Sequence, residues 1–261
     1  DTCGTGGDKK NTFNISTVVA LVVAGCDVAV AKHGNRSVSS KCGSADILEA
    51  LGVNLMLKQE HLSKCIDDVG IAFLFAQSLH PAMKNVVAAR KQIGVETIFN
   101  ILGPLTNPAK ATHQMMGVYS RDLVEPMAHV LKNLGLKRAI VVHGADGLDE
   151  ITTTDKTYIS QYKNGEIRSY DIGCEELDIP VAKESDLLGG TLEENVKIVV
   201  DILGGQLSPK RDVVVLNAAY ALFAAEKVDD IAKGVELAKG SLDSGRALAK
   251  LEDLKKFTNN I

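Results

Sequence analysis

A short polar stretch near the start of the chain holds an unusual share of the groups that bind anions. Residues 32–46, KHGNRSVSSKCGSAD, contain three cations, a histidine, an asparagine, four serines and two glycines. Hydroxyl groups and glycine let backbone N–H groups approach phosphate oxygens, while Lys32, Arg36 and Lys41 supply positive charge. The stretch therefore predicts a phosphate site. The alternative, on composition alone, is a solvated, turn-rich loop.

A second, glycine-rich stretch precedes it. Gly4, Gly6 and Gly7 lie within four positions of DTCGTGGD, and glycine accepts the positive φ angles that let a loop wrap around a phosphate. The stretch has neither the Walker A spacing nor that of a dinucleotide-binding fingerprint, so taken alone it is equally consistent with a plain turn. Residues 14–17, NIST, then begin an apolar helical pattern, and a helix amino terminus facing the loop favours anion binding.

Four further residues could do chemistry where expected strands end. His80 follows the apolar strand expected at 71–75 and Arg90 lies ten residues further on, although a histidine at a strand end can simply bond to backbone. Asp149 and Glu150 lie on a glycine-containing loop after another expected strand. Such a carboxylate pair suits a hard divalent cation, and the plainer alternative is two solvated carboxylates at a helix start.

An α/β framework is expected to position these residues. Apolar β-branched runs predict strands at 28–31, 71–75 and 138–142, and the turn Asn164-Gly165 predicts a hairpin of 157–162 with 166–170. Helical periodicity is expected over 47–51, which Ser44 would cap, and over 60–69, 123–134, 192–203, 231–242 and 246–257. Residues 212–226 combine a strand-like start with an alanine-rich helix, and the proline-containing residues 96–109 suggest a hinge.

The fold class that we expect is a central, mostly parallel sheet flanked by helices, with a smaller helical domain. Residues 1–90 and 135–261 would form the α/β part and residues 91–134 the helical segment and hinge. Open α/β sheets bind ligands at the carboxyl ends of their strands, and ligand pockets often lie where two domains meet. The site is therefore expected in the cleft between the two parts.

Composition limits the classes of partner. A net charge of −4 and a pI near 5.9 argue against a nucleic-acid binder, which would show a basic face. The apolar run 18–31 is interrupted by Gly25 and Asp27 and is too short to cross a membrane. The five cysteines lack zinc-ligand spacing and are odd in number, which favours reduced thiols and a cytoplasmic location.

The combination of motifs resembles the anthranilate phosphoribosyltransferase family, over nearly the whole chain. The motifs are GTGGD at 4–8, NIST at 14–17, KHGNRSVSSKCGSAD at 32–46, HPAMK at 80–84 with Arg90, FNILGPLTNP at 99–108, DE at 149–150 and NAAYAL at 217–222. The resemblance implies transfer of the phosphoribosyl group of PRPP to anthranilate in tryptophan biosynthesis, with Mg²⁺ as cofactor. It also implies a homodimer and an initial helical segment that is missing from this sequence.

The resemblance further assigns residues to roles. The residues that would hold PRPP are Gly4, Gly7, Asp8, Thr12, Asn14, Ile15, Ser16, Thr17, Lys32, His33, Gly34, Asn35, Arg36, Ser37, Val38, Ser39, Ser40 and Ser44. Those that would meet anthranilate are Gly4, Asn35, His80 and Arg90, and those that would hold the metal are Ser16, Asp149 and Glu150. Lys32, His33 and Arg90 are the candidate catalytic residues. One departure is Lys9, where many relatives carry glycine.

Two other functions compete with this interpretation. A nucleoside phosphorylase of the same fold group also has a glycine-rich loop and a lysine-plus-serine phosphate motif, but the KHGNR core and the spacing of His80 and Arg90 favour the anthranilate enzyme. A non-enzymatic module that binds PRPP for regulation would carry the same loops without turnover.

Overall fold

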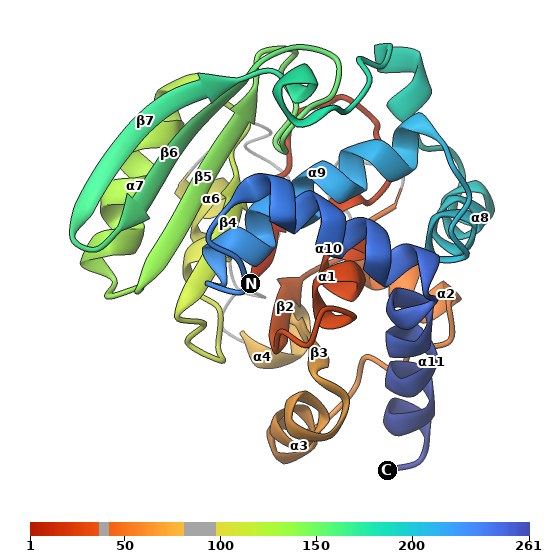
Figure 1. Ribbon diagram of the computed structural model, residues 1–261. Helices are drawn as coiled ribbons and strands as arrows, with labels where there is room; N and C mark the ends of the chain where they lie inside the picture. The colour runs from red at the N-terminus through yellow and green to blue at the C-terminus, as the bar shows by residue number, and fades with distance from the viewer. Residues whose placement is uncertain (37–41, 81–97) are drawn as a thin grey trace.

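The computed structural model describes residues 1–36, 42–80 and 98–261 of the chain. Its strands form two sheets (Figure 1). The larger sheet has the order β1-β4-β5-β6-β7, and a separate pair joins β2 to β3. The strands are β1 (Thr2–Gly4), β2 (Val30–Gly34), β3 (Ile71–Phe75), β4 (His113–Gly117), β5 (Arg138–Gly144), β6 (Thr157–Lys163) and β7 (Glu166–Ile172).

The larger sheet is mixed. β1, β4 and β5 run parallel, whereas β5, β6 and β7 form antiparallel pairs. The β2–β3 pair is also parallel, so three of the five pairings between described strands are parallel. The expected α/β class, with a central sheet flanked by helices, is confirmed.

Helices cover both faces of the larger sheet (Figure 1). Helix α7 packs on β5 and β6 from one side, and α9 packs on β4 and β5 from the other. Helix α1 in turn contacts α9, α10 and α11, and nine of its ten residues are buried, which explains why its sequence is apolar on every side. The helices are α1 (Ile15–Ala24), α2 (Ser44–Ala50), α3 (Gln59–Val69), α4 (Ala76–Leu79), α6 (Ile98–Leu105), α7 (Val124–Asn133), α8 (Leu192–Leu203), α9 (Pro209–Ala224), α10 (Ile231–Asp243) and α11 (Arg246–Asn259).

Several expected elements differ from the structure. The strand-like start expected at 212 is wrong, because Ser208 accepts a hydrogen bond from the N–H of Arg211 and Pro209 follows it, so α9 begins there as a continuous helix. Residues 96–109, where a hinge is expected, include α6, and the hinge stays a prediction. Ser44 does not cap α2: it is the first residue of that helix, and the N–H of Gly43 instead donates to Asp46.

The hairpin turn has the expected geometry. Asn164 and Gly165 have φ angles of 51° and 86°, the left-handed conformations that a tight turn between twisted strands requires. Among the residues that the structure describes, none of the helices has the length and apolarity needed to cross a bilayer.

Candidate active site

The glycine-rich loop leaves β1 at the edge where β4 and β5 also end. The N–H of Thr5 donates to the carbonyl of Gly117 at 2.9 Å, and the N–H of Gly6 donates to Oδ2 of Asp149 at 2.7 Å. Gly6 and Gly7 have φ angles of +64° and +85°, which side chains disfavour. The loop therefore turns back directly over the first residue of the expected metal pair.

Two glycines allow this approach. A Cβ at Gly4 would lie 3.0 Å from the carboxyl carbon of Asp149. A Cβ at Gly117 would lie 2.5 Å from the carbonyl carbon of the same residue and nearer still to its oxygen. Gly117 was not expected to belong to the site, because the strand HQMMG lacks a clear alternating pattern. A glycine at the end of that strand is the signal that could have revealed it.

Lys32 reaches from the second sheet into this site. Its side chain is buried, and Nζ donates to the carbonyl of Thr2 at 2.6 Å and to Oγ of Ser16 at 3.2 Å. Burial lowers the pKa of Lys32, while the nearby Cys3 and Glu150 raise it. Lys32, on β2, thus contacts both β1 and the first turn of α1.

Asp149 and Glu150, the acidic pair, lie on the connection that follows β5. Burial raises the pKa of Asp149, and the neighbouring Asp8 raises it further. Burial likewise raises the pKa of Glu150, followed by repulsion from Asp149, whereas Lys32 and the backbone of Ser16 lower it. Concentrated negative charge of this kind is what a bound cation would neutralise.

The acidic pair and the nearby Ser16 hydroxyl are oxygen donors, which fits Mg²⁺. The described residues contain no group of three or more His, Cys, Asp or Glu that could hold a metal ion. Magnesium does not require such a cage, because it keeps several waters and takes further oxygens from phosphates.

The amino terminus of α1 faces the same region. Its N-cap residue, Asn14, makes no side-chain cap and instead donates from Nδ2 to the carbonyl of Cys42 at 3.2 Å. This bond connects the start of α1 to the second polar stretch. Residues 14–17 therefore lie between the two polar stretches, with the partial positive charge of a ten-residue helix behind them.

Arg36 is neutralised by carboxylates of α2. Its guanidinium contacts Asp46 at 2.9 Å and Glu49 at 2.8 Å, and these bonds raise its pKa. Ser44 donates to the carbonyl of Asn35 at 3.3 Å. Of the remaining expected residues, Ser37, Val38, Ser39, Ser40 and Arg90 lie outside the residues that the structure describes.

Two histidines lie together beside the end of β2. The rings of His33 and His80 meet edge to face with centroids 5.1 Å apart, and Nδ1 of His33 lies 3.1 Å from the carbonyl of Gly103. Burial, then the charge of His80, lowers the pKa of His33 to about 4. Within the described parts of the chain, Nε2 of each ring is buried without a hydrogen-bond partner. Because the carbonyl of Gly103 can only accept, Nδ1 of the neutral His33 carries the proton and its Nε2 can accept a bond from a ligand, whereas Nε2 of His80 can accept or donate one.

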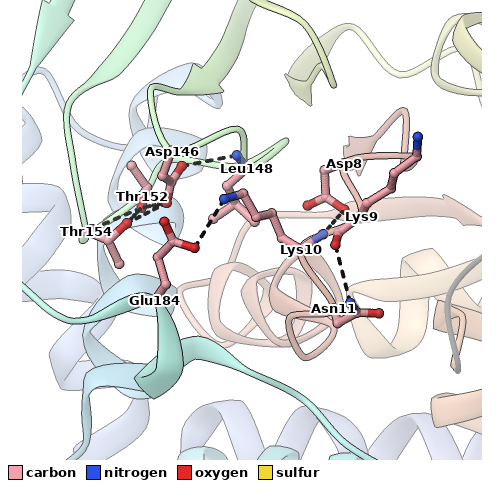
Figure 2. A network of polar contacts seen from close by, with 9 residues as sticks. All are labelled: Asp8, Lys9, Lys10, Asn11, Asp146, Leu148, Thr152, Thr154 and Glu184. Carbon is pink, nitrogen blue, oxygen red and sulfur yellow. Dashed lines mark hydrogen bonds and ion pairs between the residues drawn. The ribbon is translucent and has the colours of Figure 1, made fainter.

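The far end of the glycine-rich loop is tied to the segment around residue 188, as Figure 2 shows in part. Nζ of Lys10 lies 3.2 Å from Oε2 of Glu184, and the N–H of Gly189 donates to the carbonyl of Asn11 at 2.9 Å. Thr12 forms a β-bridge with Leu188. These contacts hold the loop at its far end.

Lys9 has a φ of 58°, the left-handed region that favours glycine. The departure seen in the sequence therefore falls where a side chain costs conformational energy.

Comparisons with known proteins identify the family. The model of the glycosyl transferase family, a/b domain, matches residues 1–248. The chain is 56% identical over 259 residues to the anthranilate phosphoribosyltransferase of Geotalea uraniireducens, which covers 99% of this chain and 74% of that relative. The corresponding enzyme of Clostridium kluyveri is 53% identical over 259 residues, with 99% and 77% covered.

Solved structures give the same result. The anthranilate phosphoribosyltransferase of Thermus thermophilus has a TM-score of 0.94 at 43% identity, covering 99% of this chain and 77% of that one. The Saccharomyces cerevisiae enzyme in complex with PRPP and Mg has a TM-score of 0.90 at 28% identity, covering 100% and 74%. The chain therefore belongs to the anthranilate phosphoribosyltransferase family.

Proposed function

We propose that this protein transfers the phosphoribosyl group of PRPP to the amine of anthranilate, releasing pyrophosphate, as a Mg²⁺-dependent step of tryptophan biosynthesis. One observation carries the proposal: the glycine-rich loop, Lys32 and the acidic pair meet in one site. Relatives support the same chemistry, since structures of the yeast enzyme are in complex with PRPP and Mg and with 4-fluoroanthranilate.

The glycine-rich loop and the start of α1 would hold the phosphate groups of PRPP. The residues that would do so are Gly4, Gly7, Asp8, Thr12, Asn14, Ile15, Ser16 and Thr17. The second polar stretch, residues 32–46, would add Lys32, His33, Gly34, Asn35, Arg36, Ser37, Val38, Ser39, Ser40 and Ser44. Arg36 would have to leave its carboxylate partners on α2, or share them, to reach a phosphate. The shared site explains how a protein of net charge −4 attracts a polyanion locally.

The chemical demand of the reaction is charge on the leaving pyrophosphate. The bond from C1 to the pyrophosphate oxygen can break ahead of attack, so charge stabilisation matters more than a strong base. Ser16, Asp149 and Glu150 would hold Mg²⁺, which when bound supplies Lewis-acid stabilisation of pyrophosphate. Loop N–H groups add preorganised donors, each typically worth ~3 kcal/mol. The buried Lys32 keeps Ser16 and Glu150 in place at this site.

The acceptor would bind beside the two histidines. The free Nε2 atoms of His33 and His80 offer polar contacts, and the lowered pKa of His33 keeps its ring neutral. Gly4 and Asn35 would contact the anthranilate ring, and Arg90 would pair with its carboxylate. Anthranilate is a neutral amine nucleophile, so correct placement replaces a dedicated base.

The organisation that we propose has residues 91–134, which include strand β4 of the larger sheet, as the helical segment and hinge beside the α/β part of 1–90 and 135–261. A cytoplasmic homodimer completes the proposal. All five cysteines are thiols outside any disulfide, which suits a reducing compartment.

A fluorescence assay tests the function. Anthranilate fluorescence should fall only when both PRPP and Mg²⁺ are present. Turnover of a pyrimidine nucleoside with inorganic phosphate would instead identify a phosphorylase, and PRPP binding without loss of anthranilate would identify a regulatory module. An Arg90→Ala variant that binds PRPP but loses affinity for anthranilate would support the role given to Arg90.

A further inference from the structure

The acidic pair lies on a connection without regular secondary structure, yet the residue on each side of it is bonded through both backbone groups. The N–H of Leu148 donates to Oδ1 of Asp146 at 3.1 Å, and its carbonyl accepts from the N–H of Gly144 at 2.8 Å. On the other side, both backbone groups of Ile151 bond to the side-chain amide of Asn217. The acidic pair thus lies between two residues whose backbones are held, Leu148 and Ile151, and the side chains that hold them are called fixed points below.

Asn217 forms the more buried of these fixed points. Its Oδ1 accepts from the N–H of Ile151 at 2.9 Å, and its Nδ2 donates to the carbonyl of Ile151 at 2.7 Å. Nδ2 also donates to the carbonyl of Val213, one turn earlier in α9, at 2.8 Å, which fixes the orientation of the amide. The side chain is fully buried and mimics a neighbouring strand. Asn217 begins the NAAYAL motif, to which no part of the reaction has given a role.

Asp146 forms the second fixed point (Figure 2). Its Oδ2 accepts from the hydroxyls of Thr152 and Thr154 at 2.7 and 2.5 Å, in addition to the bond from Leu148 to Oδ1. One carboxylate therefore joins the chain before the acidic pair to the chain after it.

The acidic pair needs such restraint. Two adjacent carboxylates, the buried Asp149 and the partly buried Glu150, repel each other, and a mobile loop would relieve the repulsion by turning them apart or out to water. A metal ion with strict octahedral preferences requires its ligands to stay converged before it arrives. Residues that orient ligands without touching the metal typically change metal affinity by about 10–100-fold.

We propose that Asn217 and Asp146 are positioning residues that hold the acidic pair in the geometry that binds Mg²⁺. The inference rests on the proposed function for the identity of the metal. Neither residue touches the ion. Asn217 acts through the backbone of Ile151, and Asp146 acts through Leu148 and the two threonines.

The test compares Asn217→Ala and Asp146→Ala with a control variant, Thr258→Val. Thr258 is buried in α11, where its hydroxyl accepts from the N–H of Asn54 at 3.1 Å. Mn²⁺ serves as a paramagnetic probe, and its binding in the presence of PRPP is measured by EPR. The expected result is a Kd for Mn²⁺ that rises about ten-fold or more in both site variants. The control should melt earlier but keep its Mn²⁺ affinity.

A second readout separates positioning from general damage. The Mg²⁺ concentration for half-maximal turnover should rise in parallel with the Kd for Mn²⁺, while KM for anthranilate at saturating Mg²⁺ stays unchanged. Mn²⁺ affinities within two-fold of the unaltered protein in both variants would overturn the inference. If Asn217→Ala does not fold, the Mn²⁺ affinity of Asp146→Ala, at a half-buried position, is the deciding measurement. Normal Mn²⁺ binding by the unaltered protein without loss of anthranilate would sink only the proposed function.

Discussion

Replacing Gly117 by alanine should damage both stability and activity. A Cβ at this position would lie 2.5 Å from the carbonyl carbon of Asp149 and nearer still to its oxygen, whereas carbon atoms normally pack at about 3.5 Å, so the two segments must separate by at least about 1 Å (3.5 − 2.5). Neither partner can rotate away, because both are backbone and residue 117 pairs with Gly4 on one side and Val142 on the other. Overpacking of this kind costs about 1–3 kcal/mol.

The expected results follow from that displacement. The free energy of unfolding should fall by about 2–3 kcal/mol, which lowers Tm by roughly 5–10 °C in a chain of this size. Turnover should fall about 100-fold, since a 1 Å misplacement of a site group costs that much. Urea unfolding followed by circular dichroism measures the first effect, and the anthranilate fluorescence assay measures the second.

Gly240→Ala is the matched control. Gly240 lies inside α10, and the nearest atom to its added Cβ is a nitrogen of Arg246 at 3.9 Å. Alanine should therefore stabilise this helix by about 0.5–1 kcal/mol without affecting turnover. An unfolding free energy of the residue 117 variant within about 0.5 kcal/mol of that of the unaltered protein, together with full turnover, would show that no such clash exists.

Three further predictions concern charge and backbone conformation. Lys32→Met should lower turnover about 100-fold, because Glu150 loses its nearby cation and Ser16 loses its donor; near-normal steady-state rates would contradict this. The pKa of His33 lies near 4 in the folded protein and near 6.5 in the unfolded chain, so the unfolded chain binds the proton first as pH falls. The free energy of unfolding should therefore fall by roughly 3 kcal/mol ((6.5 − 4) × 1.36) as pH drops from 6.5 to 4. His33→Asn should flatten that part of the pH–stability curve, and an unchanged slope would count against it. Lys9→Gly should raise the unfolding free energy by about 0.5–1 kcal/mol in urea, because it removes a side chain at a φ of 58°; lower stability would contradict this.

Much of the framework followed from local patterns. The strand expected at 71–75 and the helix expected at 192–203 have those limits in the structure, because a five-residue apolar run and a capped amphipathic segment are specified locally. β1 and β4 could not be found in this way. β1 has three residues inside the glycine motif, and its existence depends on β4, more than a hundred residues later.

Local propensity also failed where burial was complete. Residues Val213–Val215 are β-branched and suggest a strand, yet they lie in α9, which is buried on nearly all sides. The cap at Ser208 and the proline after it were the better signals. Tertiary packing decided the conformation against the preference of the side chains.

The chemical groups of the candidate site could be predicted from the sequence, but the contacts that hold those groups in place could not. Glycine, lysine and carboxylate motifs identified the groups that meet at the strand ends. Nothing in the sequence indicated that Lys32 would be buried or that Arg36 would pair with two carboxylates. Equally, the contact of Asn217 with Ile151 spans 66 residues and leaves no periodic trace.

The pairing of β1 with β4 has a consequence for how the protein is made. Thr2 pairs with Met115, and the N–H of Gly6 bonds to a carboxylate 143 residues further on. A ribosome that adds about 5–20 residues per second needs several seconds to proceed from the first strand to its partner. Until then the glycine-rich turn has nothing to fold against, so the anion pocket can form only after the chain has been synthesised beyond Asp149.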